Sequence, residues 1–450
     1  MDRKTFLHLS SAATVSSLLL PEAACNNPEP KTPIRNWAGN IVFSTDNEVV
    51  PKTAEELRSL VAAAKELKAQ GTRHCFNRIA DSKQELLSTR QLNQVIALDK
   101  EKMTVTVQAG MKYGDLAPYL HQQGFALHNL ASLPHISIAG SVATATHGSG
   151  VSNGNLATAV EALELVNGQG ELIRLSREKD GDLFRGAVVG LGALGVVTQL
   201  TLKLQPAFEM QQYVYEFLPY EQLFANFESI MGAAYSVSLF TDWQQESVNE
   251  VWIKATLEQA AGFSTEKEFF GAQPAKKDLH PIAVNDAVNC THQLGVKGPW
   301  YERLPHFKMG FTPSSGVELQ AEYFIPFDKA VDAIRAITAL GREIGPHLFI
   351  SEIRAIAADE LWLSTAYQRK SIAIHFTWKQ ETEAVMALLP KVEKALEPFA
   401  PRPHWGKLFT VSKAELASRY PRMEDFRKLA AQMDSAGKFS NAYLQEHVLG

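Results

Sequence analysis

Cysteine is scarce in this sequence, whose 450 residues include only Cys25, Cys75 and Cys290. Three cysteines are too few for the disulfide framework of a small secreted domain or for a zinc ribbon. The 13 histidines include no H-x-x-x-H pair and no C-x-x-C pair occurs, so we predict no metal site. Long apolar runs are also missing, and no stretch approaches the ~20 residues that a membrane-spanning helix requires.

Positive charge is not in excess either, since 44 Lys and Arg stand against 49 Asp and Glu and the net charge is −5. Without a basic surplus, a nucleic acid or an anionic membrane surface is disfavoured as a partner. The 45% hydrophobic and 21% charged fractions exclude collagen-like, low-complexity and wholly disordered chains. At ~100–200 residues per domain, this composition indicates a soluble multidomain protein, most simply an enzyme.

The first 25 residues are typical of an export signal. Arg3 and Lys4 provide a basic start similar to a degenerate twin-arginine signal, and residues 12–20 form a short apolar stretch. Cys25 follows two alanines, as in a lipoprotein cleavage site, so it is a candidate lipid anchor. We therefore expect a periplasmic or lipid-anchored protein, with the frayed terminus of a cytoplasmic enzyme as the alternative.

The remaining chain divides by composition and by expected secondary structure. Short strands and helices alternate in the first domain, whereas the second has longer alternating strands and many aromatic residues. The expected segments are a proline-rich linker (26–35), a first domain (36–206), a second domain richer in antiparallel sheet (207–395) and a C-terminal segment (396–450).

Several elements of the first domain have clear sequence signals. Thr53 opens a capping box, and the apolar residues that follow predict a helix whose buried face extends to Leu67 and whose stop is Gly71. Alternating residues predict a strand at 104–107, a hairpin at 164–175 and a long strand at 195–204.

The glycines at 190, 192 and 195 satisfy the G-x-G-x-x-G pattern of dinucleotide-binding folds. In those folds the motif follows a strand and precedes a helix, so that the phosphates meet a helix N-terminus. Here a helical stretch precedes the glycines and a β-branched run follows them. We therefore interpret them as a helix-to-strand turn that permits close backbone packing.

Two segments of the first domain contain more small and hydroxylated residues than a core requires. They are the polar loop 71–77, expected directly after a helix, and the segment 131–150. Small side chains let backbone N–H groups and hydroxyls gather around a phosphate or a flat polar ring system. A generic small-residue loop is the alternative.

Two strands of the second domain have one polar and one apolar face. Residues two apart on a strand share a face, so Glu352 joins Arg354 and His375 joins Thr377. The opposite faces carry Ile353 and, from the second strand, Phe376 and Trp378. This pattern predicts either a polar site or a solvent-exposed strand face.

Together with Gly-Ala-Leu-Gly-Val-Val-Thr at 192–198, the two small-residue segments resemble the FAD-binding domain of the vanillyl-alcohol oxidase superfamily. The similarity is greatest to its alditol (xylitol) oxidase branch, which is related to the sugar-1,4-lactone oxidases. Residues 36–40 and 132–137 carry the branch-specific part of the resemblance, which covers nearly all of residues 36–449.

The resemblance implies an α+β fold, with a two-part PCMH-type FAD-binding domain and an α+β substrate cap built on a mainly antiparallel sheet. It implies FAD as the cofactor, attached covalently to His74 through the flavin 8α-methyl group. The 71–77 loop departs from the usual Gly-His-Ser pattern, because Arg73 precedes His74 and Cys75 follows it. The implied cofactor-binding residues are Gly71, Thr72, Arg73, His74, Cys75, Phe76, Asn77, Ser132, Ser137, Gly140, Ser141, Thr144, Ala145, Thr146, His147 and Val196.

The resemblance also implies a reaction, in which the terminal CH–OH of a polyol gives hydride to flavin N5 and O2 accepts the electrons as H2O2. The implied catalytic residues are His375, Lys407, Arg354 and Glu352, and the implied substrate-binding residues are Ser132, Glu352, Arg354, Thr377 and Lys407. Either His375 or Lys407 would receive or stabilise the hydroxyl proton. Two alternatives stay open: an arabinono- or gulono-lactone oxidase or dehydrogenase, and a non-catalytic exported binding protein.

Overall fold

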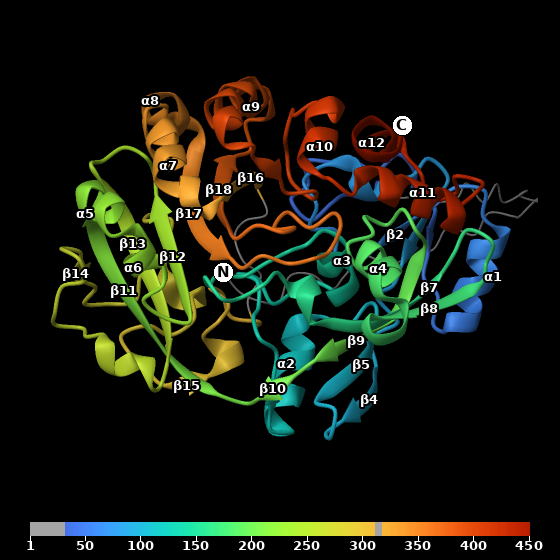
Figure 1. Cartoon of the computed structure of the whole chain (residues 1–450), viewed down its shortest axis with the longest axis horizontal. Helices are drawn as coiled ribbons and strands as arrows, with labels where there is room; N and C mark the ends of the chain where they lie inside the picture. Colours follow the sequence, from blue (N-terminus) through green and yellow to red (C-terminus); the bar gives the residue numbers. More distant parts are fainter. Residues whose placement is uncertain (1–31, 311–316) are drawn as a thin grey trace, which may run out of the picture. The chain divides into compact units, whose positions relative to one another are not determined.

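The computed structural model describes residues 32–310 and 317–450, and residues 33–450 form one compact unit (Figure 1). The predicted export signal and Cys25 lie outside the described residues. Within the described ranges, no helix has the length and apolar character needed to cross a membrane.

The first helix is shorter than its sequence pattern predicts. This region contains β1 (Glu48–Val49), α1 (Ala54–Ala63), β2 (Leu67–Gln70) and β3 (Glu85–Ser88). The Thr53 side chain caps α1 as expected, accepting from the backbone N–H of Glu56. Leu67, however, begins β2, which pairs in parallel with β3. Strand pairing overrides the helical spacing, so the prediction that Gly71 and the 71–77 loop follow a helix is wrong.

A second sheet of the first domain is antiparallel, in the order β4-β5-β9-β7-β8. Its strands are β4 (Val95–Asp99), β5 (Thr104–Gln108), β7 (Val160–Val166), β8 (Leu172–Ser176) and β9 (Val196–Lys203). The helices of this region are α2 (Tyr113–Gln122), α3 (Ile138–Ala143) and α4 (Arg177–Val188). The predicted strand, hairpin and long strand are confirmed. Because α4 precedes the three glycines and β9 follows them, the reversed order that argued against a dinucleotide motif is confirmed as well.

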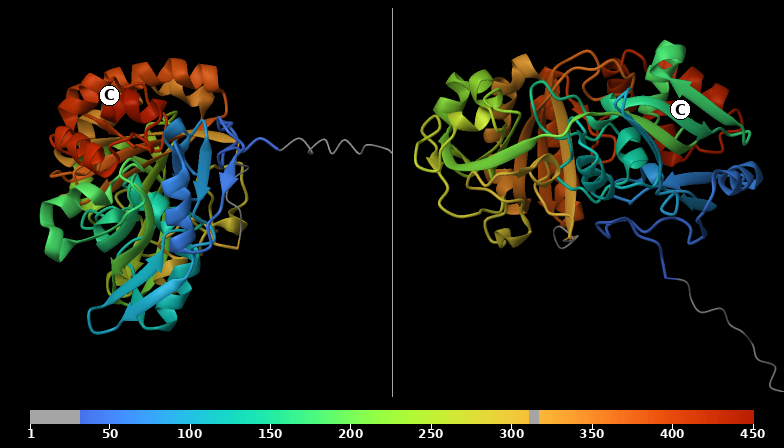
Figure 2. Two further views of the ribbon diagram at one scale, coloured as in Figure 1. Left: turned by 90° about the vertical axis from the view of Figure 1, so that its right-hand side faces the viewer. Right: turned by 90° about the horizontal axis from the view of Figure 1, so that it is seen from below.

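The chain then passes from one sheet into another. After β9 it forms β10 (Gln205–Pro206), which pairs with β6 (Phe125–Ala126), and continues into β11 (Glu209–Pro219). The right-hand view of Figure 2 shows this green run crossing toward the large sheet. The predicted boundary at residue 206 falls within this crossing.

The large sheet of the described region has nine strands, in the order β14-β11-β13-β12-β17-β18-β16-β19 with β15 beside β11. Its other strands are β12 (Ser236–Thr241), β13 (Ser247–Thr256), β14 (Gln273–Pro274), β15 (Gly298–Pro299), β16 (Glu318–Pro326), β17 (Leu348–Ile356), β18 (Ser371–Lys379) and β19 (Arg402–Pro403). The accompanying helices are α5 (Tyr220–Ala225), α6 (Phe227–Met231), α7 (Ala330–Thr338), α8 (Gly341–Ile344) and α9 (Thr382–Leu396). Its pairings are antiparallel, so the predicted α+β fold with a mainly antiparallel cap sheet is confirmed.

The two faces of this sheet differ in chemistry, as the sequence predicts. Ile353, Phe376 and Trp378 point to one face and share a buried apolar cluster with side chains of α7 and α9. On the opposite face, Glu352 of β17 lies directly across from His375 of β18. Apolar burial therefore fixes the register that presents the charged residues together.

The C-terminal segment contains α10 (Lys413–Arg419), α11 (Met423–Met433) and α12 (Ala442–Leu444). It returns to the first domain, where the buried Lys68 of β2 donates to the carbonyl oxygens of Gly192 (2.8 Å) and Phe439 (3.0 Å). Asn77 donates to the carbonyl oxygens of Trp405 and Lys407, both at 2.8 Å. These bonds hold the segment around Lys407 beside the 71–77 loop.

Candidate active site

A cavity lies where the small-residue segments of the first domain meet the polar face of the nine-stranded sheet. Its lining comes from the 71–77 loop, from the 131–147 segment, from β16, β17 and β18, and from residues 404–407. Segments far apart in sequence therefore build a single site.

One part of the cavity has the features of a cofactor cradle. A Cβ placed at Gly71 would collide with the Oγ of Ser137, and a Cβ at Gly140 would come within 2.9 Å of it. The Ser137 Oγ is buried and has no hydrogen-bond partner within the described residues. The two glycines thus leave the space that the Ser137 hydroxyl occupies, and this hydroxyl is a free donor on the cavity wall, so these residues fit the pyrophosphate of FAD.

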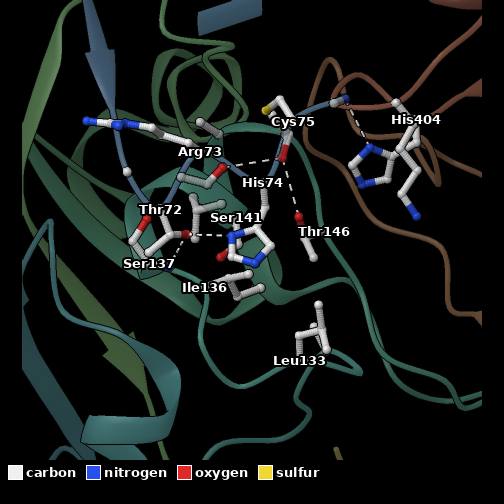
Figure 3. Close-up of a pocket in the computed structure, with 18 of the residues that line it drawn as sticks. Thr72, Arg73, His74, Cys75, Leu133, Ile136, Ser137, Ser141, Thr146 and His404 are labelled. Carbon is white, nitrogen blue, oxygen red and sulfur yellow. Dashed lines mark hydrogen bonds between the residues drawn. The ribbon is translucent and has the colours of Figure 1, made fainter. Parts of the chain in front are cut away.

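His74 lies at the edge of this cradle (Figure 3). Its Nδ1 lies 3.1 Å from Thr72 Oγ1, and its ring stacks on Trp37 with centroids 4.9 Å apart. Its Nε2 is buried without a partner in the described part of the chain. Burial, together with the charge of His135, lowers the pKa of His74 to about 4, so the ring is neutral at neutral pH. A neutral, oriented imidazole keeps a lone pair for bonding.

Glu322 of β16 is the centre of the charged cluster on the sheet. Its Oε1 accepts from Arg354 Nη2 at 2.6 Å and lies 3.1 Å from His147 Nε2. Its Oε2 accepts from Lys407 Nζ at 2.6 Å. Burial alone raises the pKa of Glu322, but the charges of Lys407, His147 and Arg354 hold it well below its ordinary value. Glu322 is therefore an anion that holds two cations side by side.

A second carboxylate, Glu352, borders the same cluster. Its Oε2 lies 3.5 Å from Arg354 Nε, and its Oε1 lies 2.7 Å from Nε2 of the buried His306. Although burial raises its pKa, Arg354 and His306 lower it well below the ordinary value, so Glu352 is ionised. Arg354 also donates to Ser132 Oγ at 3.4 Å, which links the sheet to the 131–147 segment.

The protonation of His375 follows from its neighbours. Gln320 Nε2 donates to a carboxylate oxygen of Glu318 at 2.6 Å, so the Gln320 oxygen faces His375 Nε2 at 3.1 Å. His375 Nε2 must then carry the proton, which leaves Nδ1 as the nitrogen with a lone pair. Burial and the charge of Lys407 lower the pKa of His375 well below its ordinary value, so the ring is neutral.

The structure places most of the predicted site residues on the cavity wall, with three exceptions. Asn77 instead caps a short 3-10 helix, accepting from the N–H of Ile79, and Ala145 is buried. Val196 packs in a separate apolar cluster, and its neighbour Val197 lines the cavity because side chains alternate along β9. The predicted residues on the wall are Gly71, Thr72, Arg73, His74, Cys75, Phe76, Ser132, Ser137, Gly140, Ser141, Thr144, Thr146, His147, Glu352, Arg354, His375, Thr377 and Lys407.

Sequence reasoning missed Glu322, Gln320 and His306. A signal existed for the first two, because residues 318–322 alternate polar and apolar side chains as β17 and β18 do. His306 lies in an irregular segment, where the sequence has no periodicity from which the direction of its side chain could be predicted.

Comparisons with known proteins agree with this geometry. The sequence profile of the "FAD binding domain" family matches residues 46–176, and that of "D-arabinono-1,4-lactone oxidase" matches residues 315–447. The chain is 47% identical over 418 residues to alditol oxidase from Streptomyces sp., covering 92% of this chain and 99% of the relative. It is 30% identical over 441 residues to L-gulono-1,4-lactone dehydrogenase from Mycobacterium tuberculosis, covering 92% and 98%.

Solved structures share the fold at much lower identity. Cholesterol oxidase from B. sterolicum superposes with a TM-score of 0.76 at 14% identity, covering 96% of this chain and all of that one. A solvent-stable cholesterol oxidase gives a TM-score of 0.72 at 15% identity. These structures establish the architecture alone.

Proposed function

The chain belongs to the family of FAD-dependent oxidoreductases that includes alditol oxidase, and on this premise we propose that it oxidises the terminal CH–OH of a polyol, such as xylitol or sorbitol, with O2 as the electron acceptor. The observation that carries the proposal is the cluster on the cavity wall. Glu352, Arg354, His375 and Lys407 line the same cavity as the FAD cradle, and together they offer hydrogen-bond acceptors and donors for a chain of hydroxyl groups.

Each residue of the cluster has a role that its chemistry permits. When bound, FAD supplies the acceptor for the hydride that leaves the reacting carbon. His375 is neutral and has a lone pair, so it can take the hydroxyl proton. Lys407 can stabilise the negative charge that develops on the reacting oxygen, or receive the proton itself when it is neutral. Burial lowers the pKa of Lys407, and Glu322 partly opposes that shift.

The other side chains orient the substrate. Ionised Glu352 accepts hydrogen bonds from hydroxyl groups, whereas Arg354 donates to their oxygens. Ser132 and Thr377 add hydroxyls on two sides of the cavity. A primary alcohol with neighbouring hydroxyls can donate hydrogen bonds to Glu352 and accept them from Arg354.

A sugar-lactone oxidase or dehydrogenase is the second candidate, favoured by the profile match over residues 315–447 and by the 30% identical dehydrogenase. Steady-state comparison of xylitol, sorbitol and gulonolactone separates the two. We expect kcat/KM to be higher for the polyols. A higher value for the lactone would assign the protein to the second candidate.

We further propose that FAD is attached covalently to His74, because this imidazole is neutral and borders the cradle. Acid-precipitated wild-type protein is expected to stay yellow, with flavin mass on the peptide that contains His74. His74→Ala should fold but release its flavin into the supernatant on acid treatment. Cys75→Ser is the matched control and should keep the colour, and free FAD released from the wild type would contradict the link.

We propose export as well, by a route that carries folded protein. Residues from both ends of the described chain line the cavity that contains the FAD cradle, so a protein loaded with FAD in the cytoplasm would have to cross the membrane folded. Cell fractionation should find a processed chain outside the cytoplasm, and mass spectrometry of its N-terminus should show whether Cys25 carries lipid. Unprocessed full-length protein in the cytoplasm would contradict export.

A further inference from the structure

A fully buried lysine lies behind the substrate wall. Lys254 of β13 has no exposed surface. Its Nζ donates to the carbonyl oxygens of Leu304 (2.6 Å) and Pro305 (2.9 Å) and lies 3.0 Å from Nδ1 of His306. Burial lowers the pKa of Lys254 well below its ordinary value, and the charge of Glu352 opposes that shift. The two carbonyl oxygens and the ring nitrogen suit the ammonium form, whose three hydrogens serve all three contacts.

The lysine therefore fixes the tautomer of His306. Because Nδ1 accepts from Lys254, the ring proton lies on Nε2, which donates to Glu352 Oε1 at 2.7 Å. The edges of Phe240 and Trp252 hold the ring in this orientation, with centroids 5.4 and 5.2 Å away. Lys254, His306 and Glu352 are thus linked by hydrogen bonds. Glu352 and His306 line the cavity, while Lys254 lies behind them.

We propose that Lys254 and His306 are positioning residues that keep Glu352 an anionic acceptor, so that the site selects substrates with a hydroxyl donor at that point. With the opposite tautomer, a nitrogen lone pair would face the carboxylate, and Glu352 would have to take up a proton to avoid the repulsion. Its one proton would then be donated to the His306 nitrogen, and the remaining oxygen would be a neutral acceptor that can no longer form a charge-assisted hydrogen bond with a substrate hydroxyl. The inference rests on the proposed function and deepens it, because it names the substrate group that Glu352 recognises, a hydroxyl that donates a hydrogen bond.

Two substitutions of His306 separate this role from simple packing. Both His306→Gln and His306→Leu remove the ring from between Phe240 and Trp252. Gln can still accept from Lys254 through its oxygen and donate to Glu352 through its nitrogen, whereas Leu can do neither. We expect KM to rise about tenfold or more in His306→Leu, with a smaller change in kcat, and to stay within about threefold of wild type in His306→Gln.

A third variant adds a pH signature. The charged groups that face His306 are Lys254, Glu352 and Arg354. Burial and the Lys254 charge lower the pKa of His306 to about 4, so wild-type KM should not vary with this group above pH 5. In Lys254→Met the pKa of His306 rises toward its ordinary 6.5. Without Lys254 the neutral ring can adopt either tautomer, so part of the protein lacks the Nε2 donor to Glu352. Protonation places a hydrogen on both ring nitrogens and completes this donor, so KM of the variant should fall as the pH decreases from 7 to 5.

The experiment measures KM and kcat of the holoenzyme for the polyol or lactone that is the better wild-type substrate, and for its monodeoxy analogues. A wild type that oxidises neither class refutes the proposed function and, with it, this inference. With an active wild type, equal KM values for His306→Gln and His306→Leu overturn the inference alone. In His306→Leu the preference for the fully hydroxylated substrate should also shrink, and an unchanged preference would contradict the proposal.

The nitrogen spectrum of ¹⁵N-histidine-labelled protein reads the tautomer independently of turnover. We expect one Nε2-protonated ring that is absent from His306→Gln and whose signals shift in Lys254→Met. An Nδ1-protonated ring at this position would overturn the proposal.

Discussion

Replacing Lys407 by Met is expected to slow flavin reduction by ~10²-fold or more at saturating polyol, the scale of losing one electrostatic contact to a developing oxyanion. Lys407 Nζ is held by Glu322 Oε2 at 2.6 Å and lines the cavity. Its charge matters most when the reacting oxygen becomes negative, which happens only as hydride leaves. Anaerobic stopped-flow reduction across xylitol concentrations measures this rate.

Glu352→Gln is the matched control for that experiment. Glu352 is assigned to a hydroxyl that is bound before the reaction, so losing the charge-assisted hydrogen bond should weaken binding by ~1.5–3 kcal/mol. The reduction rate at saturation should change less than in Lys407→Met. If Lys407→Met alters only the apparent dissociation constant, the roles given to these two residues are wrong.

Glu322→Gln is expected to cost both stability and rate, although we assign Glu322 no contact with the reacting atoms. The substitution keeps the shape but leaves Arg354 and Lys407 buried without their shared counter-ion, a loss of about 3–5 kcal/mol in the free energy of unfolding. Because Glu322 raises the pKa of Lys407, its loss lowers that pKa further and favours the neutral amine. Flavin reduction should then slow by a factor similar to that of Lys407→Met at pH 8.

The pH dependence of the Glu322→Gln variant distinguishes this cause from general damage. Lowering the pH reprotonates Lys407, so the rate of flavin reduction should rise from pH 8 to pH 6, whereas a misfolded site would not recover. For stability, the pKa of Glu322 in the folded protein lies below its ordinary 4.5, so its contribution is complete above pH 4.5 and is lost as the pH falls below it. The unfolding free energies of wild type and variant should converge in that acidic range. A constant difference would contradict the pairing.

Much of the site could be predicted because strand alternation is a local signal. Glu352, Arg354, His375 and Thr377 share a face since Ile353, Phe376 and Trp378 must be buried on the other. The turn at residues 190–195 was also predictable, because the sequence shows a helical pattern before the glycines and a β-branched run after them.

Other features depend on contacts that no local pattern reports. The apolar spacing up to Leu67 is typical of a helix, but the pairing of β2 with β3 makes Leu67 the start of a strand. Val196 and Val197 are equally apolar, and only the packing of β9 determines which of them faces the cavity. Lys254 and His306 meet 52 positions apart, through a loop whose path the sequence does not indicate.

Anaerobic mixing of the purified yellow protein with a polyol panel tests the central claim most directly. The account predicts that xylitol or sorbitol bleaches the flavin absorbance, and that admitting air restores it with formation of H2O2. Flavin that stays oxidised with every polyol but is bleached by gulonolactone would contradict polyol oxidation.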